Sequence, residues 1–313
     1  MKILLTGLSS LSGLRFAQAL RRKGHEVWGG VTRASLDQYD GLRRARLQEW
    51  DGPVLTRLQF GSPGFLAALE REGPFDLCCH HGAEISDYRN PQFDFLDAAR
   101  RNTGDALAAC QALAASGCRA LLATGSYFEA EEGGTPRDDQ RAIYAYGLSK
   151  TLSWHILRHA SERAGLLPAK FVMPTPFGAL EEPRLAAYLV SRWKAGETPV
   201  LQTPFYVRDH LPIDLMAEGY AQFCERVALA PRETPAAIFR PSGFVESVGA
   251  FAERLADEFG RREGKAFSVD ASTQSSQEEP QDRRNTESLL TSVYPWDAQA
   301  FWDAYHAFYF RQG

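Results

Sequence analysis

Tyr146 and Lys150, four residues apart, are the side chains of this 313-residue chain best suited to acid–base chemistry. On a helix this spacing places both on one face, with about 5–6 Å between their Cβ atoms. An ammonium at that distance favours the phenolate and lowers a phenol pKa that is otherwise near 10, at about 1.4 kcal/mol per unit. The pair therefore predicts a proton-transfer site in which Tyr146 is the acid or base. Tyr144 is the rival, but Leu148 stands four residues after it and offers no charge.

A glycine-containing turn near the N-terminus predicts a site for a dinucleotide. The apolar residues 2–5 are followed by TGLSSLSG at 6–13 and by an amphipathic stretch at 14–23. In this order of strand, turn and helix, the free N–H groups and the positive end of the helix bind a pyrophosphate. Gly7 permits the tight turn and Gly13 permits close packing, while Ser10 stands at the middle position, which is usually glycine. The expected pyrophosphate contacts are Gly7, Ser10, Leu11, Ser12 and Gly13.

The end of the next strand candidate, residues 26–31, indicates which nicotinamide dinucleotide binds. An acid there accepts hydrogen bonds from the adenosine ribose, whereas an arginine suits a 2′-phosphate. The chain reads VWGGVTR at 27–33 and has no acid before Asp37. Arg33 therefore favours NADP(H) over NAD(H), with both retained as expected cofactors.

The elements that must position these residues follow from alternating apolar and helical patterns over the first 175 residues. The strand candidates are residues 2–5, 26–31, 54–60, 77–79, 120–123 and 169–173. Strands separated by helical stretches indicate right-handed βαβ units and a parallel sheet. The predicted class is α/β, with a Rossmann-type doubly wound parallel sheet and a smaller C-terminal substrate domain.

The rhythm changes after residue 175, where prolines interrupt the chain. We expect a helix at 244–259, a mobile loop or weak strand at 268–285, and a C-terminal helix that packs Phe301, Tyr305 and Phe308 on its own domain. The expected dinucleotide-binding domain is 1–175 together with about 209–243. The expected substrate-binding domain is about 176–208 together with 244–313.

Composition bears on the partners that the protein can bind and on the cellular compartment in which it works. A net charge of −4 gives no reason to expect nucleic acid, and no apolar run reaches membrane-spanning length. The first residues read as a strand rather than a signal peptide. The five cysteines form no C-x-x-C pair, which predicts small buried thiols in a reduced, cytoplasmic protein. The histidine spacing predicts no metal site.

Taken in order, these segments resemble the extended short-chain dehydrogenase/reductase family, in its nucleotide-sugar epimerase/dehydratase branch. The likeness covers almost the whole chain. Within the branch, the chain resembles members of the UDP-glucose 4-epimerase type and of the 4-keto-sugar reductase type. The matching motifs are T-G-x-x-G-x-x-G at 6–13 with one glycine changed, V-x-H-x-A-A at CHHGA 79–83, N-x-x-G-T at NTG 102–104, Y-x-x-x-K at 146–150, P-F-N-V-Y-G-P ending at FG 177–178, and R-D-[FY]-I-H-V-x-D at RDHLPID 208–214.

The resemblance implies hydride transfer between a nicotinamide and a sugar carbon, at C4, with Lys150 also contacting the nicotinamide ribose. Further cofactor contacts implied by the resemblance are His81, Gly82, Ala83, Asn102 and Pro174. The implied substrate contacts are Ser126, Tyr127, Thr175 and Arg208, with Arg208 on the diphosphate of a nucleotide sugar.

A hydroxyl that holds the substrate oxygen is expected at the end of the strand before Tyr146. Counting from the strand start favours Ser126, whereas counting to the later aromatic favours Thr124. Neither is followed by the Asp-Glu pair that sugar 4,6-dehydratases of this family use, so dehydration is not expected. Two activities therefore remain as alternatives: an epimerase, which leaves its cofactor unchanged after each turnover, and a 4-keto-sugar reductase, which consumes NADPH.

Other functions remain open beside these two. The chain could be a non-catalytic NAD(P) sensor of the same fold or a reductase of a non-sugar ketone. Family members dimerise through the helix that carries the Tyr/Lys pair, and Leu148, Leu152 and Ile156 form an apolar stripe there. We therefore expect a homodimer.

Overall fold

A computed structural model describes residues 1–85, 90, 92–134, 141–231, 234–275, 279–291 and 293–311. Its centre is a seven-stranded sheet in the order β3-β2-β1-β4-β5-β6-β9, with every neighbouring pair parallel. The strands are β1 (Lys2–Thr6), β2 (Glu26–Gly30), β3 (Val54–Leu55), β4 (Leu77–His80), β5 (Ala120–Ser126), β6 (Leu167–Met173) and β9 (Ala237–Phe239). The predicted doubly wound parallel sheet is confirmed.

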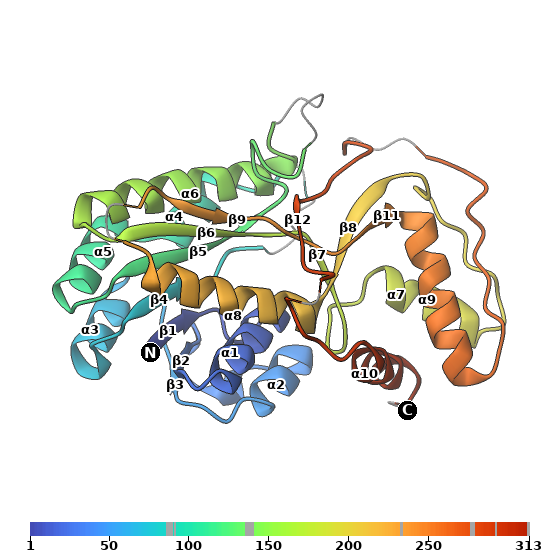
Figure 1. The fold of residues 1–313 in the computed structure, drawn as a ribbon, viewed down its shortest axis with the longest axis horizontal. Helices are drawn as coiled ribbons and strands as arrows, with labels where there is room; N and C mark the ends of the chain where they lie inside the picture. The colour runs from blue at the N-terminus through green and yellow to red at the C-terminus, as the bar shows by residue number, and fades with distance from the viewer. Residues whose placement is uncertain are drawn as a thin grey trace.

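Helices cover both faces of this sheet (Figure 1). One layer holds α1 (Leu11–Arg22), α2 (Gly41–Gln48) and α8 (Ile213–Leu229); the other holds α3 (Pro63–Glu72), α4 (Phe95–Thr103), α5 (Ala106–Ala115) and α6 (Tyr144–Ala164). Successive strand residues alternate between two apolar cores: Ile3 and Leu5 pack in the first, and Leu4 packs in the second. A short 3₁₀ helix, η1 (Leu36–Gln38), precedes α2.

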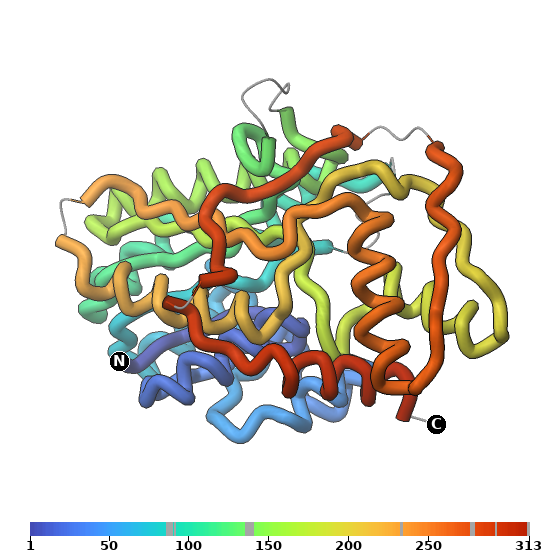
Figure 2. Tube along the Cα trace, turned by 45° about the vertical axis from the view of Figure 1, so that its right-hand side comes forward, coloured from blue at the N-terminus to red at the C-terminus, as the bar shows by residue number. Residues whose placement is uncertain are grey.

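The later chain builds a second, smaller part beside the carboxyl edge of the sheet. It contains a three-stranded sheet of β7 (Thr175–Phe177), β8 (Val207–Pro212) and β11 (Phe244–Ser247), with α7 (Leu185–Lys194), α9 (Val248–Glu263) and α10 (Ala298–Phe310). Figure 2 shows the chain after residue 279 returning across the molecule. It then pairs β12 (Glu287–Ser288) with β10 (Pro241–Ser242).

Two expected elements differ from the structure. The strand expected at 54–60 is confined to Val54–Leu55. The helix expected at 244–259 was wrong for its first four residues, which form β11 and pair antiparallel with β8. The Ser247 side chain accepts from the Ala250 N–H and so starts α9 only after that strand.

The polar segment expected to be a loop or weak strand at 268–285 contains well-buried side chains. Arg283 is 2% exposed and Asn285 is 4% exposed. The Asn285 amide donates to Val172 O and Pro241 O, so it joins the segment to the main sheet. Residues 276–278 lie outside the described residues. The expected packing of the C-terminal helix is confirmed for Phe301 and Tyr305, which are buried in the core.

In the described part of the chain, no helix is both long and apolar enough to cross a membrane. All five cysteines are buried free thiols.

Candidate active site

The candidate site lies at the carboxyl edge of the central sheet, where β1, β4, β5 and β6 end side by side. In open α/β sheets this edge is where ligands bind. The turn after β1 begins at Gly7, the turn after β4 carries His81, β5 ends at Ser126, and Pro174 separates β6 from β7. The parallel register therefore brings four of the expected segments to one edge.

The turn between β1 and α1 requires its two glycines. Gly7 has φ +81°, and a Cβ on it would lie 2.8 Å from Gly82 N. A Cβ on Gly13 would lie 2.2 Å from Gly7 O. Ser10, at the middle glycine position of the family pattern, folds its hydroxyl back into the turn: it donates to Gly7 O at 2.9 Å and accepts from Gly13 N at 3.0 Å. The serine therefore caps α1, which starts at Leu11.

His81 joins this turn to β5. Its Nε2 lies 3.1 Å from Ser10 Oγ and 2.9 Å from Ser12 Oγ, and its Nδ1 lies 3.0 Å from Thr124 Oγ1. The ring also packs edge-on against Phe16. Burial lowers the pKa of His81 to about 3, so the imidazole is neutral at pH 7. The expected cofactor contact is thus a half-buried side chain that links the turn to β5.

Asn102 supports the segment after β4 in a similar way. Its Oδ1 accepts from Glu84 N at 2.7 Å, which fixes the strand exit that carries Gly82 and Ala83. Its backbone carbonyl lies 2.7 Å from His80 Nε2, and His80 Nδ1 lies 2.9 Å from Thr6 Oγ1. Burial lowers the pKa of His80 to about 4. Asn102 is 4% exposed, so it supports the carboxyl edge of the sheet from the protein interior.

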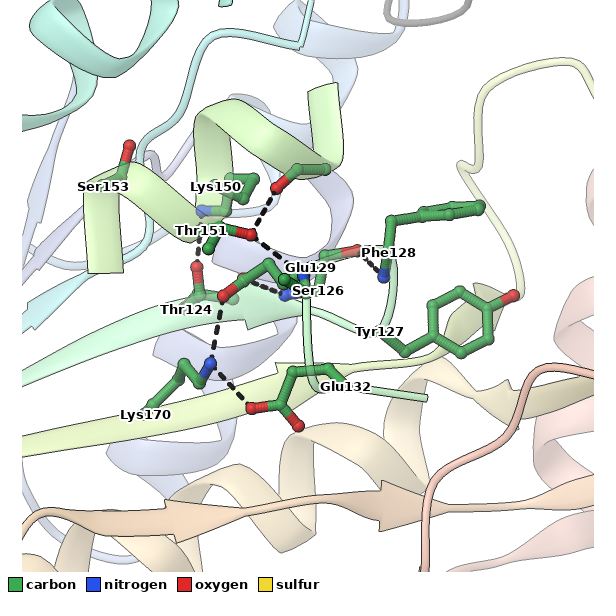
Figure 3. Close-up of polar contacts among 12 residues, drawn as sticks. Thr124, Ser126, Tyr127, Phe128, Glu129, Glu132, Lys150, Thr151, Ser153 and Lys170 are labelled. Carbon is green, nitrogen blue, oxygen red and sulfur yellow. Dashed lines mark hydrogen bonds and ion pairs between the residues drawn. The ribbon is translucent and has the colours of Figure 1, made fainter. Parts of the chain in front are cut away.

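Tyr146 and Lys150 lie on the first two turns of α6, with Tyr146 half-buried and Lys150 buried. The Lys150 ammonium donates to Thr124 O at 2.6 Å, and burial lowers the pKa of Lys150 (Figure 3). Gly147 lets the helix start approach the β5 exit, because a Cβ there would lie 2.2 Å from Phe128 O. The two hydroxyl candidates lie at this exit: Thr124 Oγ1 contacts His81, and Ser126 Oγ accepts from Phe128 N at 3.2 Å.

A buried charge cluster beside Lys150 was not anticipated. Lys170 on β6 lies 3.0 Å from Glu129 Oε2 and 2.7 Å from Glu132 Oε1, and Glu132 also pairs with Arg240. The sequence signal was a single lysine inside the apolar run LPAKFVM at 167–173, together with the acids that come earlier in the chain, just after β5. Such a lysine is informative because charged side chains are rarely buried unless paired.

The expected substrate residues lie farther along the same edge. The Tyr127 and Thr175 hydroxyl oxygens are 2.6 Å apart, and burial raises the pKa of Tyr127 to about 12. Arg208 is 8% exposed, and its Nη2 donates to Glu279 Oε2 at 2.9 Å. The neighbouring acid Asp209 instead accepts from Gly243 N. Arg208 is therefore neutralised by an acid far along the chain.

Arg33 follows β2 and is exposed, with its guanidinium over the Tyr39 ring at 5.3 Å. Its backbone N–H donates to Tyr39 Oη at 3.2 Å, which fixes the turn that carries it. Within the described part of the chain, no group of three or more His, Cys, Asp or Glu side chains is arranged to hold a metal ion.

Comparisons with known proteins agree with this geometry. The sequence model of the NAD dependent epimerase/dehydratase family matches residues 3–236. No curated protein sequence matches the chain. At these low identities, the following likenesses show the fold.

The chain is similar to a variant of the UDP-glucuronic acid 4-epimerase from Bacillus cereus, solved with UDP-4-deoxy-4-fluoro-glucuronic acid and NAD: TM-score 0.73, 15% identity, 99% of each chain covered. It is also similar to the UDP-glucose 4-epimerase of Thermus thermophilus solved with NAD, with TM-score 0.68, 18% identity and 99% of each chain covered. A third is the UDP-Glc/GlcNAc 4-epimerase of Campylobacter jejuni, with TM-score 0.68, 17% identity and 98% of each chain covered.

Proposed function

This chain belongs to the NAD-dependent epimerase/dehydratase family, and we propose that it transfers hydride at C4 of a nucleotide-activated sugar, as an epimerase or as a 4-keto-sugar reductase. The observation that carries the proposal is the Tyr146–Lys150 pair on α6, with the Lys150 ammonium held by Thr124 O at 2.6 Å. This places a cation and a phenol at the sheet edge that also carries the glycine turn. The alternatives are a non-catalytic NAD(P) sensor of the same fold and a reductase of a non-sugar ketone.

The residues at the edge fit a nicotinamide dinucleotide, because side chains at Gly7 and Gly13 would fill the turn that receives a pyrophosphate. When bound, that cofactor supplies the hydride donor or acceptor. The residues that would hold it are Gly7, Ser10, Leu11, Ser12, Gly13, Arg33, His81, Gly82, Ala83, Asn102, Tyr146, Lys150 and Pro174. Within that set, His81 bonds side-chain hydroxyls of the turn and of β5, and Asn102 bonds the backbone after β4.

Tyr146 transfers the proton at the substrate oxygen, as base when an alcohol is oxidised and as acid when a ketone is reduced. Lys150 stabilises the phenolate, because a nearby opposite charge favours the ionised form. One N–H of its ammonium is used by Thr124 O, which fixes the direction of the side chain. The ammonium is buried, so its charge acts at low local polarity and is screened little by salt.

The contacts at the β5 exit support Ser126 as the hydroxyl that holds the substrate oxygen. Thr124 directs its hydroxyl to His81 Nδ1, on the side of the sheet that packs against α1. Ser126 Oγ accepts from Phe128 N–H, which orients the hydroxyl and leaves its proton for a substrate oxygen.

Arg208 is the proposed contact for the diphosphate, with Tyr127 and Thr175 beside the sugar. Because Glu279 already pairs with Arg208, a substrate phosphate would compete with that carboxylate for the guanidinium. The substrate would lie between the dinucleotide-binding domain, 1–175 with about 209–243, and the domain formed by about 176–208 and 244–313.

A panel of UDP-, GDP-, dTDP- and CDP-sugars, followed by absorbance of the reduced nicotinamide and by product analysis, tests the proposal. An epimerase converts one sugar to another without net cofactor consumption, and a reductase consumes NADPH in proportion to product. Cofactor binding without turnover of any member would favour the sensor. If neither NAD(H) nor NADP(H) binds, the enzymatic function is excluded.

Changing Arg33 to alanine is expected to weaken NADPH binding about 10-fold or more and to leave NADH binding nearly unchanged. The reason is that hydrogen bonds to a charged group contribute roughly 1.5–3 kcal/mol, and only NADPH carries the 2′-phosphate. Fluorescence titration with both cofactors measures this difference. Arg158→Ala, which removes an exposed ion pair on α6, is the control. An equal loss for both cofactors would show that Arg33 does not read the phosphate.

We also propose a homodimer through α6 and the neighbouring α5. Leu148 and Ile156 are 36% and 42% exposed, and Leu107 on α5 is 45% exposed. Together they extend the apolar stripe that the sequence predicts. Light scattering should give twice the chain mass, and Ile156→Asp should give a monomer. Leu229→Asp, at an 84% exposed position on α8, should leave the mass unchanged. A wild-type monomer would refute the proposal.

A further inference from the structure

A buried set of charges lies directly behind the Tyr146–Lys150 pair. The side chains of Glu129, Glu132 and Lys170 are only 1%, 3% and 4% exposed. Lys170 Nζ bridges the two carboxylates at 3.0 and 2.7 Å, and Figure 3 shows it reaching up from β6 between them. The Lys170 ammonium also lies 5.2 Å from the centre of the Trp154 ring on α6.

The β5 exit is shaped to admit this cluster. A Cβ on Gly125 would lie 2.8 Å from Glu129 Oε1 and 2.9 Å from Lys170 Cδ, so a larger residue there would displace these two side chains. A buried ion pair adds little net stability compared with well-packed apolar residues of similar volume. We therefore expect the cluster to act on the protonation and position of neighbouring side chains more than on the stability of the fold.

Two contacts connect the cluster to the active site. Glu129 Oε1 accepts from the backbone N–H of Ser126 at 2.7 Å, so the carboxylate fixes the proposed substrate-holding residue. A cavity of about 10 Å³ joins the cluster to the catalytic lysine, and Glu129, Lys150 and Lys170 all line it. A cavity of this size holds at most about one water molecule.

The charge on Lys150 depends on the groups that face it from every packed element. His80 and His81 from β4 are neutral at pH 7, because burial lowers their pKa values to about 4 and 3. Tyr146 lies one turn away on α6. The remaining charges are the negative Glu129, which raises the pKa of Lys150, and the positive Lys170, which lowers it. Burial itself acts in the same direction as Lys170.

We propose that Glu129 and Lys170 are positioning residues that tune the charge of Lys150 in opposite directions, Glu129 holding it protonated and Lys170 opposing this, while Glu129 also fixes Ser126. Through Lys150 the two residues set the pH range over which Tyr146 can exchange a proton. This second step rests on the proposed function, whereas the coupling of the three charges does not.

Lysine titration by NMR tests the coupling without any substrate. The chain contains six lysines, so protein labelled with ¹³C at lysine Cε gives few signals, and Lys150→Met identifies the one of interest. Glu129→Gln keeps an oxygen for the Ser126 N–H, removes the negative charge and gives up the acceptor oxygen that Lys170 uses. It should lower the Lys150 titration midpoint by about one pH unit or more, and Lys170→Met should raise it by a similar amount.

Matched variants separate this effect from a general loss of structure. The double variant Glu129→Gln with Lys170→Met should return the midpoint close to that of the wild type, since the two shifts oppose each other. Glu181→Gln removes a buried carboxylate that binds Tyr305 and Tyr309 in the smaller part of the molecule, and should not move the midpoint. If Glu129→Gln does not fold, Lys170→Met and the double variant still show in which direction each charge shifts the Lys150 titration midpoint.

The outcomes are distinct. Midpoints that do not move, or that move in the same direction in both single variants, overturn the proposal. If a nucleotide sugar is converted, the alkaline limb of the pH profile of kcat should shift with the Lys150 midpoint. It should move to lower pH in Glu129→Gln and to higher pH in Lys170→Met. A profile that does not shift in this way overturns the positioning role. If no nucleotide sugar is converted, the proposed function fails while the lysine titration still decides the coupling.

Discussion

Tyr146→Phe is expected to lower turnover by about 10²–10⁴-fold, the usual contribution of a positioned acid–base group. The substitution removes the only atom by which Tyr146 exchanges a proton and leaves the ring between Phe93 and Phe128, which it contacts edge-on. Lys150 keeps its bond to Thr124 O, so the helix start and the β5 exit should stay in place. The loss should therefore appear in kcat.

The measurement is steady-state turnover of the substrate identified by the nucleotide-sugar panel, together with cofactor titration of the same protein. Cofactor affinity should change little, because the glycine turn and β4 exit are untouched. Tyr188→Phe is the matched control: its hydroxyl bonds the backbone of Val200 in the smaller part of the molecule, and turnover should be retained. Full activity of Tyr146→Phe would remove the phenol from the mechanism.

Sequence patterns were sufficient for features that depend on residues close together in the chain. The turn from β1 into α1 was predicted because Gly7 and Gly13 meet backbone within the same βα unit or at the adjacent strand exit. The Tyr146–Lys150 pair was predicted because its spacing belongs to one helix. The role of Ser10 as a cap was not predicted, although serine is a favoured N-cap residue.

Longer-range pairings escaped sequence reasoning. The pairing of Arg208 with Glu279 was not predicted, because Glu279 belongs to a segment that returns much later in the chain. Lys170 likewise pairs with acids that follow a different strand. Neighbouring residues on a strand point to opposite faces, so Arg208 and Asp209 could not share a partner. Such contacts depend on the tertiary fold, which local patterns do not specify.

Lowering the pH from 6.5 is expected to destabilise the protein through three histidines that are neutral in the folded state. Burial lowers the pKa values of His80, His81 and His210 to about 4, 3 and 3. The folded state thus excludes protons that the unfolded chain binds below its ordinary pKa of 6.5. Stability from these groups is fully present above that pH and is lost as pH falls toward the folded values. Their summed contribution is about 4 kcal/mol per pH unit.

Two buried carboxyls act in the opposite direction. Burial raises the pKa values of Glu181 and Asp209, so their stabilising effect is present at low pH and is lost as pH rises through the raised values. They offset part of the histidine effect in the range above their ordinary values. Near pH 5, three histidines against two carboxyls still leave a net excess of about one proton, or about 1.4 kcal/mol per pH unit.

His210→Phe isolates one of these protons. The His210 ring stacks on Phe251 at 3.7 Å, and among the described residues neither of its nitrogens has a hydrogen-bond partner. A phenyl ring keeps the stacking and removes the titration, so the slope of unfolding free energy against pH should fall by about 1.4 kcal/mol per unit between pH 6 and 4. Urea unfolding at several pH values measures that slope, with His155→Gln at an exposed position as the control. Because the buried imidazole also lacks partners at neutral pH, the variant should be no less stable than the wild type at pH 7. A slope equal to that of the wild type would mean that His210 carries its proton in the folded state.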